Sequence, residues 1–246
     1  MQKTDPKITR SSYDKSAEEY HNSLLNPETN FYHKQIEKPA MISFLKSIVR
    51  NKEVLDLGCG SGIFTKKIAS WNSNVVGLDF SSKLINIAKR ENPEIKFYIG
   101  NASKTPFKNS QFDIVTSSLM AHYFKNLRLL FKEVSRILKR KGIFVFSISH
   151  PLSGLLSETK IKGKKRMMIM PYFQNRKVVW EIFKESEVVD YQHTFETIIN
   201  SLADSDFVIE RVLEPKPPKE SKRFNERAYK KTSNYPSFLI IKARKK

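Results

Sequence analysis

The chain has 246 residues, of which 39% are hydrophobic, and this suits one α/β domain with a single core. The formal net charge of +19 favours an anionic partner such as nucleic acid, although lysines spread along the chain also fit a compositional bias. No apolar run approaches the ~20 residues of a membrane helix, and residues 1–16 lack the apolar core of a signal peptide. A single cysteine, Cys59, excludes an intramolecular disulfide. We therefore expect a cytoplasmic protein that does not associate with membranes.

Residues 1–50 are expected to form an N-terminal helical cap, because Tyr13, Ala17 and Tyr20 recur near helical spacing and a second such pattern follows Pro39. Short apolar strands then alternate with helices. The strands are expected at 53–57, 74–78, 95–99, 112–117 and 143–149. This alternation predicts a mostly parallel sheet covered by helices on both faces.

The clearest helix precedes the last of those strands. Its apolar side chains form one stripe: Leu127, Leu130, Phe131, Val134 and Leu138. The cations at 139–141 would then complement the helix dipole, and Gly142 would supply a left-handed cap.

Residues 151–193 interrupt the alternation and are too long for an ordinary connection. Their methionines and aromatic residues suit a lid or an apolar substrate wall, or else ordinary packing. Residues 194–246 would add a helix and two strands, 207–213 and 237–242, joined by a surface loop. We expect a single domain made of the cap (1–50), a core (51–150), this insertion and the C-terminal elements.

A glycine-rich turn follows the first strand, in the segment Val54–Gly62. Glycines let the backbone turn tightly and approach a ligand, and Asp79, at the end of the next apolar run, could hold ribose hydroxyls. The spacing is G-x-G-x-G rather than the G-x-G-x-x-G of dinucleotide enzymes, which argues against a dehydrogenase. Asp56 would repel a pyrophosphate but suits a ligand with an amino group and a sulfonium.

This segment resembles motif I of the class I S-adenosylmethionine-dependent methyltransferases. Residues 76–81 resemble the second motif of these enzymes, and residues 112–115 resemble their fourth strand. Other segments resemble a type 11-like subgroup of undefined substrate: Asn30, 37–40, 142–151, 214–217 and 236–239. The resemblance implies a Rossmann-like, doubly wound sheet of seven mostly parallel strands, the last one antiparallel. It also implies S-adenosylmethionine as the cofactor and methyl transfer as the reaction.

The resemblance also implies which residues bind the cofactor. Asp56 and the loop with Gly58, Cys59 and Gly60 would hold its methionine part, Cys59 serving as a small loop residue rather than a reactive thiol. Asp79 would accept both ribose hydroxyls.

Several further residues would complete the cofactor site by the same resemblance. Phe80 would pack on the adenine, and Asn101 and Ala102 would lie beside it, although many relatives carry an acid in place of Asn101. Ser117 and Ser118 would line the sulfur and methyl group. Tyr13, with Tyr20 as the second candidate, would close over the cofactor or simply belong to the core.

Methyl transfer needs a base only when the acceptor arrives protonated. His150 ends the fifth strand, and His122 follows the fourth beside Tyr123, so these three residues are the catalytic candidates. Either histidine could accept a proton, orient a substrate or bond a nearby carbonyl. No cluster of residues has the spacing of metal ligands, so no metal is expected.

The acceptor stays open at this stage. An O or N atom of a small organic molecule is favoured over RNA, because Ser117–Met120 lacks the Asn/Asp-Pro-Pro-Tyr/Phe motif of amino-directed nucleic-acid enzymes. A cofactor-binding protein without catalysis is a further alternative. The protein is expected to be a monomer or a homodimer.

Overall fold

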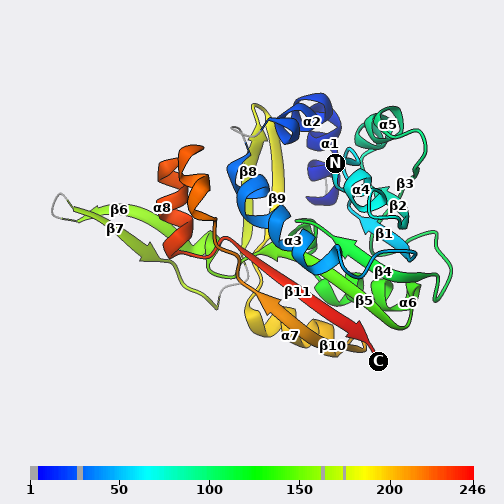
Figure 1. Cartoon of the computed structure of the whole chain (residues 1–246). Helices are drawn as coiled ribbons and strands as arrows, with labels where there is room; N and C mark the ends of the chain where they lie inside the picture. Colours follow the sequence, from blue (N-terminus) through cyan, green and yellow to red (C-terminus); the bar gives the residue numbers. More distant parts are fainter. Residues whose placement is uncertain (1–4, 27–29, 162–163, 174–175) are drawn as a thin grey trace.

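The computed structural model describes residues 5–26, 30–161, 164–173 and 176–246. A seven-stranded sheet crosses the molecule in the order β10-β11-β5-β4-β1-β2-β3 (Figure 1). Its strands are β1 (Glu53–Leu57), β2 (Asn74–Asp79), β3 (Lys96–Ile99), β4 (Phe112–Ser117), β5 (Leu138–Ser149), β10 (Phe207–Leu213) and β11 (Phe238–Lys245). Within this sheet β11 runs antiparallel to both neighbours, and the remaining pairs are parallel. The predicted α/β fold is confirmed.

Helices cover both faces of the sheet. On one face, α3 (Lys38–Leu45) and α4 (Ile63–Ala69) pack through Met41 and Ile68. On the other, α6 (Leu127–Ile137) and α7 (Phe195–Ala203) contribute side chains such as Phe131 and Leu202 to the larger core cluster. Helix α5 (Ser82–Glu91) packs near β2 and β3, and the Ser81 hydroxyl caps it by accepting from Leu84 N at 3.1 Å.

The capping prediction for α6 is wrong. The helix ends at Ile137, and Leu138 already pairs with Phe112 as the first residue of β5. The left-handed residue is Lys141, with φ of 61°. Gly142 is instead required by close packing, because a Cβ there would lie 2.8 Å from the Lys139 carbonyl oxygen.

The N-terminal cap and part of the insertion form one unit. The cap comprises α1 (Asp5–Lys15), α2 (Ala17–Leu25) and the π-helical turn η1 (His33–Glu37). Residues 151–193 form a short turn, η3 (Ser153–Leu155), and two hairpins: β6 (Leu156–Ile161) with β7 (Lys164–Ile169), and β8 (Lys177–Phe183) with β9 (Ser186–Tyr191). The β8–β9 hairpin joins α1 through Val189 N, which donates to Thr9 Oγ1 at 3.1 Å.

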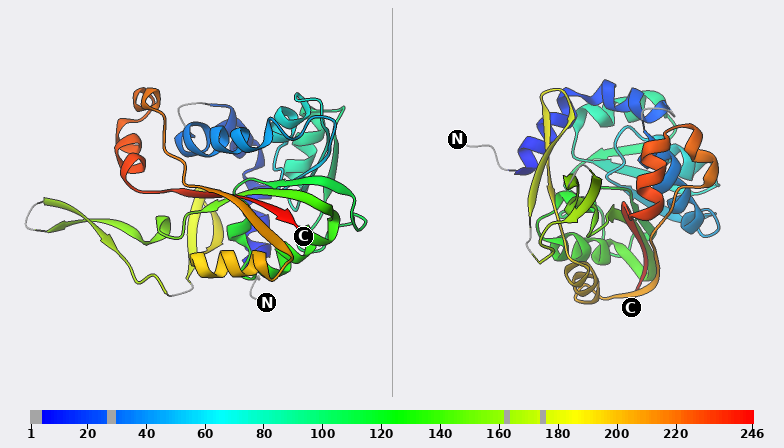
Figure 2. Two further views of the ribbon diagram at one scale, coloured as in Figure 1. Left: turned by 60° about the horizontal axis from the view of Figure 1, so that its bottom comes forward. Right: turned by 90° about the vertical axis from the view of Figure 1, so that its left-hand side faces the viewer.

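The β6–β7 hairpin extends away from the body of the molecule, as the left side of Figure 1 and the left view of Figure 2 show. Met168, in β7, is 50% exposed, and Phe173, which follows the hairpin, is 87% exposed. These two side chains therefore do not form the apolar wall that the composition of the insertion suggested.

The segment between β10 and β11 is not simply a surface loop. It contains η4 (Lys219–Arg223) and α8 (Glu226–Asn234), and the Asn225 side chain caps α8 by accepting from Ala228 N at 2.9 Å. The abundance of proline and lysine before α8 concealed this helix. It brings Lys231 and Tyr235 to the cavity described below.

Two features are missing from the part of the chain that the structure describes. None of its helices combines the length and hydropathy that crossing a bilayer requires. No group of three or more His, Cys, Asp or Glu side chains is arranged there to hold a metal ion.

Candidate functional site

The site is expected where the strand order reverses, between the neighbouring strands β1 and β4. Helix α4, which leaves β1, covers one face of the sheet, while α6, which leaves β4, covers the other. The carboxyl ends of these strands carry Asp56 and Ser117. The topology therefore brings the predicted glycine loop and the residues after β4 to one edge of the sheet.

The glycine loop has a conformation that side chains would oppose. Gly58, Gly60 and Gly62 have φ of 80°, 54° and 79°. A Cβ on Gly58 would lie 2.6 Å from Met120 Cγ, whereas one on Gly60 would meet only Tyr20, at 3.8 Å. Gly60 thus leaves open space on one side of the loop, where a ligand can approach the backbone.

Asp79 is bonded directly to that loop. Its Oδ2 accepts from Gly60 N at 2.9 Å, and its Oδ1 accepts from Ser81 N at 2.8 Å. Burial nevertheless raises the pKa of Asp79 to about 6, against the lowering effect of these bonds. The carboxylate is oriented by the backbone and retains lone pairs for further donors.

Asp56 is a second buried carboxylate beside the loop. Its Oδ2 accepts from Thr65 Oγ1 at 2.6 Å, and burial raises its pKa to about 6. Burial also raises the pKa of the Cys59 thiol. A neutral, buried thiol agrees with the expectation that Cys59 is a small structural residue of the loop and not a reactive thiol.

The predicted adenine contacts lie beyond β2 and β3. The Phe80 ring is partly buried, with its centroid 6.1 Å from that of Tyr13. Ala102 is buried, while Asn101 is exposed and its Oδ1 accepts from Ser103 N at 2.9 Å. The carbonyl oxygen of Asn101 is therefore already used within its own turn, and its adenine bond stays a prediction.

The two serines after β4 differ in their contacts. Ser117 is buried, and its hydroxyl has no hydrogen-bond partner among the described residues. The Ser118 hydroxyl donates to Glu37 Oε1 at 2.8 Å. Sequence reasoning assigned no function to Glu37, although it lies in the segment 37–40 that carries part of the resemblance.

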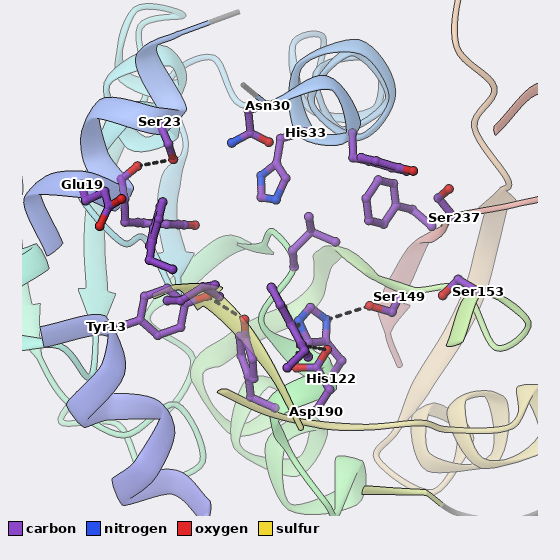
Figure 3. Close-up of a pocket in the computed structure, with 18 of the residues that line it drawn as sticks. Tyr13, Glu19, Ser23, Asn30, His33, His122, Ser149, Ser153, Asp190 and Ser237 are labelled. Carbon is purple, nitrogen blue, oxygen red and sulfur yellow. Dashed lines mark hydrogen bonds and ion pairs between the residues drawn. The ribbon is translucent and has the colours of Figure 1, made fainter. Parts of the chain in front are cut away.

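A cavity of about 980 Å³ lies between the N-terminal cap, the β8–β9 hairpin and the end of α8 (Figure 3). Four of its lining residues are candidates from the sequence: Tyr13, Tyr20, His122 and Tyr123. The hydroxyls of Tyr13 and Tyr123 are 2.6 Å apart. Tyr20 also lines the cavity and lies near Gly60, so it stands between the cavity and the glycine loop.

His122 faces a carboxylate that sequence reasoning missed. Its Nε2 is 3.9 Å from Asp190 Oδ1, and its Nδ1 is 3.5 Å from the Ser149 hydroxyl. Within the described residues Asp190 Oδ1 is buried without a hydrogen-bond partner, while Oδ2 accepts from Trp180 Nε1 at 2.9 Å. Burial lowers the pKa of His122, and the charge of Asp190 partly opposes that shift.

His150 lies elsewhere. Its Nδ1 accepts from Leu152 N at 3.1 Å, and its Nε2 is 2.8 Å from Glu214 Oε1. It is not among the residues that line the cavity. A catalytic role for His150 stays a prediction. The geometry favours His122, because both ring nitrogens of His150 already have partners and neither can contact the methyl acceptor.

The chain is similar to known methyltransferases. A family model described as a methyltransferase domain, of the type 11 kind, matches residues 55–146. An uncharacterized protein of Haemophilus influenzae is 31% identical over 228 residues, which are 85% of this chain and 87% of that one. A demethylmenaquinone methyltransferase of Renibacterium salmoninarum is 34% identical over 43% of this chain and 45% of its own length.

Solved structures agree. The crystal structure of an S-adenosylmethionine dependent methyltransferase from Mesorhizobium loti matches with a TM-score of 0.76 and 28% identity, covering 85% of this chain and 97% of that one. The residues beside the glycine loop fit that cofactor, because Gly60 leaves open space for a ligand and Asp56 and Asp79 are buried carboxylates whose pKa burial raises to about 6. The chain belongs to the class I S-adenosylmethionine-dependent methyltransferases of the type 11 kind, and S-adenosylmethionine is its cofactor.

Proposed function

We propose that the enzyme methylates an oxygen or nitrogen atom of a small organic molecule that binds in the cavity, with His122 as the proton acceptor. The observation that supports this most is the pairing of His122 with Asp190 inside a cavity at the carboxyl ends of β4 and β5. The volume of about 980 Å³ is at the upper end of the range of small-molecule sites.

The cofactor supplies an electrophilic methyl group on a sulfonium, which is already a good leaving group. The protein then has to align the acceptor and exclude water. Tyr13 and Tyr123 suit this task, because their bonded hydroxyls and edge-to-face rings, 6.0 Å apart, form a rigid wall between the cap and the loop after β4.

His122 can serve as the base because burial lowers its pKa and so leaves the imidazole neutral near pH 7. The bound cofactor would supply the methyl carbon to the lone pair of the acceptor atom, and its sulfur would keep the electron pair of the carbon–sulfur bond. The acceptor proton passes to Nε2 of His122, where Asp190 Oδ1 stabilises the imidazolium.

The test is methyl transfer from isotopically labelled S-adenosylmethionine to a metabolite extract and, separately, to bulk RNA at physiological salt. We expect label in the small-molecule fraction. Label confined to RNA would contradict the proposal and favour the nucleic-acid alternative, for which the net charge of +19 is the argument.

The base assignment is tested on the identified acceptor with His122→Gln. We expect turnover to fall by about 10²–10⁴-fold, the usual contribution of a general base, with cofactor affinity unchanged. His193→Gln is the matched control, because His193 is also buried but its Nε2 is bonded to the Phe124 carbonyl oxygen outside the cavity lining. Equal losses in the two variants would show that His122 acts only in packing.

A further inference from the structure

A buried acid lies next to a lysine where η1 passes into α3. The Glu37 side chain is fully buried, and its Oε1 accepts from the hydroxyls of Ser118 at 2.8 Å and Ser147 at 2.6 Å. Its Oε2 has no hydrogen-bond partner among the described residues, and Lys38 Nζ is 3.5 Å away from it. One oxygen of this carboxylate is thus fully used, and the other is not.

Lys38 is held in place without being buried. Its Nζ donates to the Ser118 hydroxyl at 2.6 Å and lies 4.1 Å from the centroid of the Phe64 ring. The Lys38 side chain is 26% exposed to solvent, so its ammonium can still contact a ligand. Phe64 is in the first turn of α4, directly after the glycine loop, and Ser118 directly follows β4.

The charges of Glu37 and Lys38 both act on Asp56, the acid of the glycine motif. Lys38 lowers the pKa of Asp56, and Glu37 raises it. Together with the contacts to Phe64 and Ser118, this places the pair between the carboxyl ends of β1 and β4, beside the loop that faces the cofactor.

A buried carboxylate oxygen without a donor is costly, and a cation that arrives with a ligand would offset that cost. A free amino acid group carries both complementary charges, an ammonium and a carboxylate. We propose that Glu37 and Lys38 bind the amino acid end of S-adenosylmethionine, with its ammonium on Glu37 Oε2 and its carboxylate on Lys38 Nζ. This assignment concerns the cofactor and does not depend on which acceptor is methylated.

Glu37 also supports the turn after β4, and the test has to separate the two effects. The Ser147 hydroxyl, which donates to Glu37, accepts from Leu119 N at 2.9 Å, and Leu119 has a left-handed φ of 50°. Glu37→Gln keeps an oxygen that can accept from both serines but replaces Oε2 by an amide that cannot bind an ammonium. It therefore preserves the turn while removing the proposed contact.

The experiment is calorimetric titration with S-adenosylhomocysteine and with 5′-methylthioadenosine, which has the same adenine, ribose and sulfur but no amino acid group. For Glu37→Gln and Lys38→Gln we expect at least about tenfold weaker binding of S-adenosylhomocysteine, with the affinity for methylthioadenosine within about twofold of wild type. Lys46→Gln, an exposed lysine that follows α3, is the control and should change neither affinity.

The two ligands make the outcomes decisive. An equal loss of affinity for both would show that the pair is structural and does not contact the amino acid end. Unchanged affinity for S-adenosylhomocysteine in both variants would place that end elsewhere. Either result overturns the proposal.

Discussion

The edge of the sheet that carries the glycine motif and the cavity beside it are built in different ways. At the edge, Gly60 and Asp79 are bonded and only 19 residues apart in the chain. In the cavity, Tyr13 and Tyr123 are bonded across 110 residues, and Asp190 reaches His122 from a hairpin of the insertion. The comparison teaches that the glycine motif predicted to hold the cofactor is built locally, whereas the cavity proposed for the acceptor is built by segments that meet only in the fold.

The largest effect is expected at the local motif. Asp79→Ala removes an oriented, charged acceptor of the ribose hydroxyls and should weaken S-adenosylhomocysteine binding by about 100-fold or more. Calorimetry measures the affinity, and circular dichroism checks the fold. Asp79→Asn, which can still accept one bond, should lose less; an Asp79→Ala variant with wild-type affinity would move the ribose site elsewhere.

Asp190→Asn addresses the cavity. Its side-chain oxygen can still accept from Trp180, but the charge beside His122 is lost, so turnover should fall by about tenfold. Because that charge raises the pKa of His122, the acidic limb of the kcat profile should also move to lower pH. A profile that keeps its midpoint would mean that Asp190 does not act through His122.

Cofactor affinity should depend on pH because of the acid at the edge of the sheet. Asp79 has a pKa of about 6, so it is ionised above that pH and protonated below it. The ionised form accepts hydroxyl bonds more strongly, and S-adenosylhomocysteine affinity should therefore fall as the pH decreases through about 6, by up to about tenfold per unit. Titrations between pH 5 and 8 measure this, and in Asp79→Asn the dependence should weaken, leaving the part that Asp56, whose pKa is also about 6, contributes.

The smallest effects distinguish the two parts of the insertion. Trp180→Phe keeps an aromatic wall but loses the donor to Asp190, so KM for the acceptor should rise by about threefold. Phe173→Ser changes a side chain that is 87% exposed and does not line the cavity, and it should leave KM unchanged. Equal effects on KM would mean that the whole insertion, and not only β8–β9, contacts the acceptor.

The sheet and the glycine loop could be predicted because their signals are short-range. The predicted bounds of β1 and β4 match the structure, since apolar runs and turn residues determine them locally. Glu37 could not be recognised as a site residue, because its partner serines lie 81 and 110 residues away. Asp190 could not be recognised either, because His122, the residue that it faces, is also distant in the sequence. The end of α6 was missed because strand pairing of Leu138 with Phe112 overrides the local capping signal.

The bonds between the cap and the β8–β9 hairpin have a kinetic consequence. Ser12 Oγ donates to the Glu187 carbonyl oxygen at 2.5 Å, and the hydroxyls of Ser16 and Ser186 are also 2.5 Å apart. Two segments about 170 residues apart in the chain are thereby fastened into one roof over the cavity. We therefore expect α1 and β9 to open and close together, and amide hydrogen exchange in the two should slow together when S-adenosylhomocysteine binds.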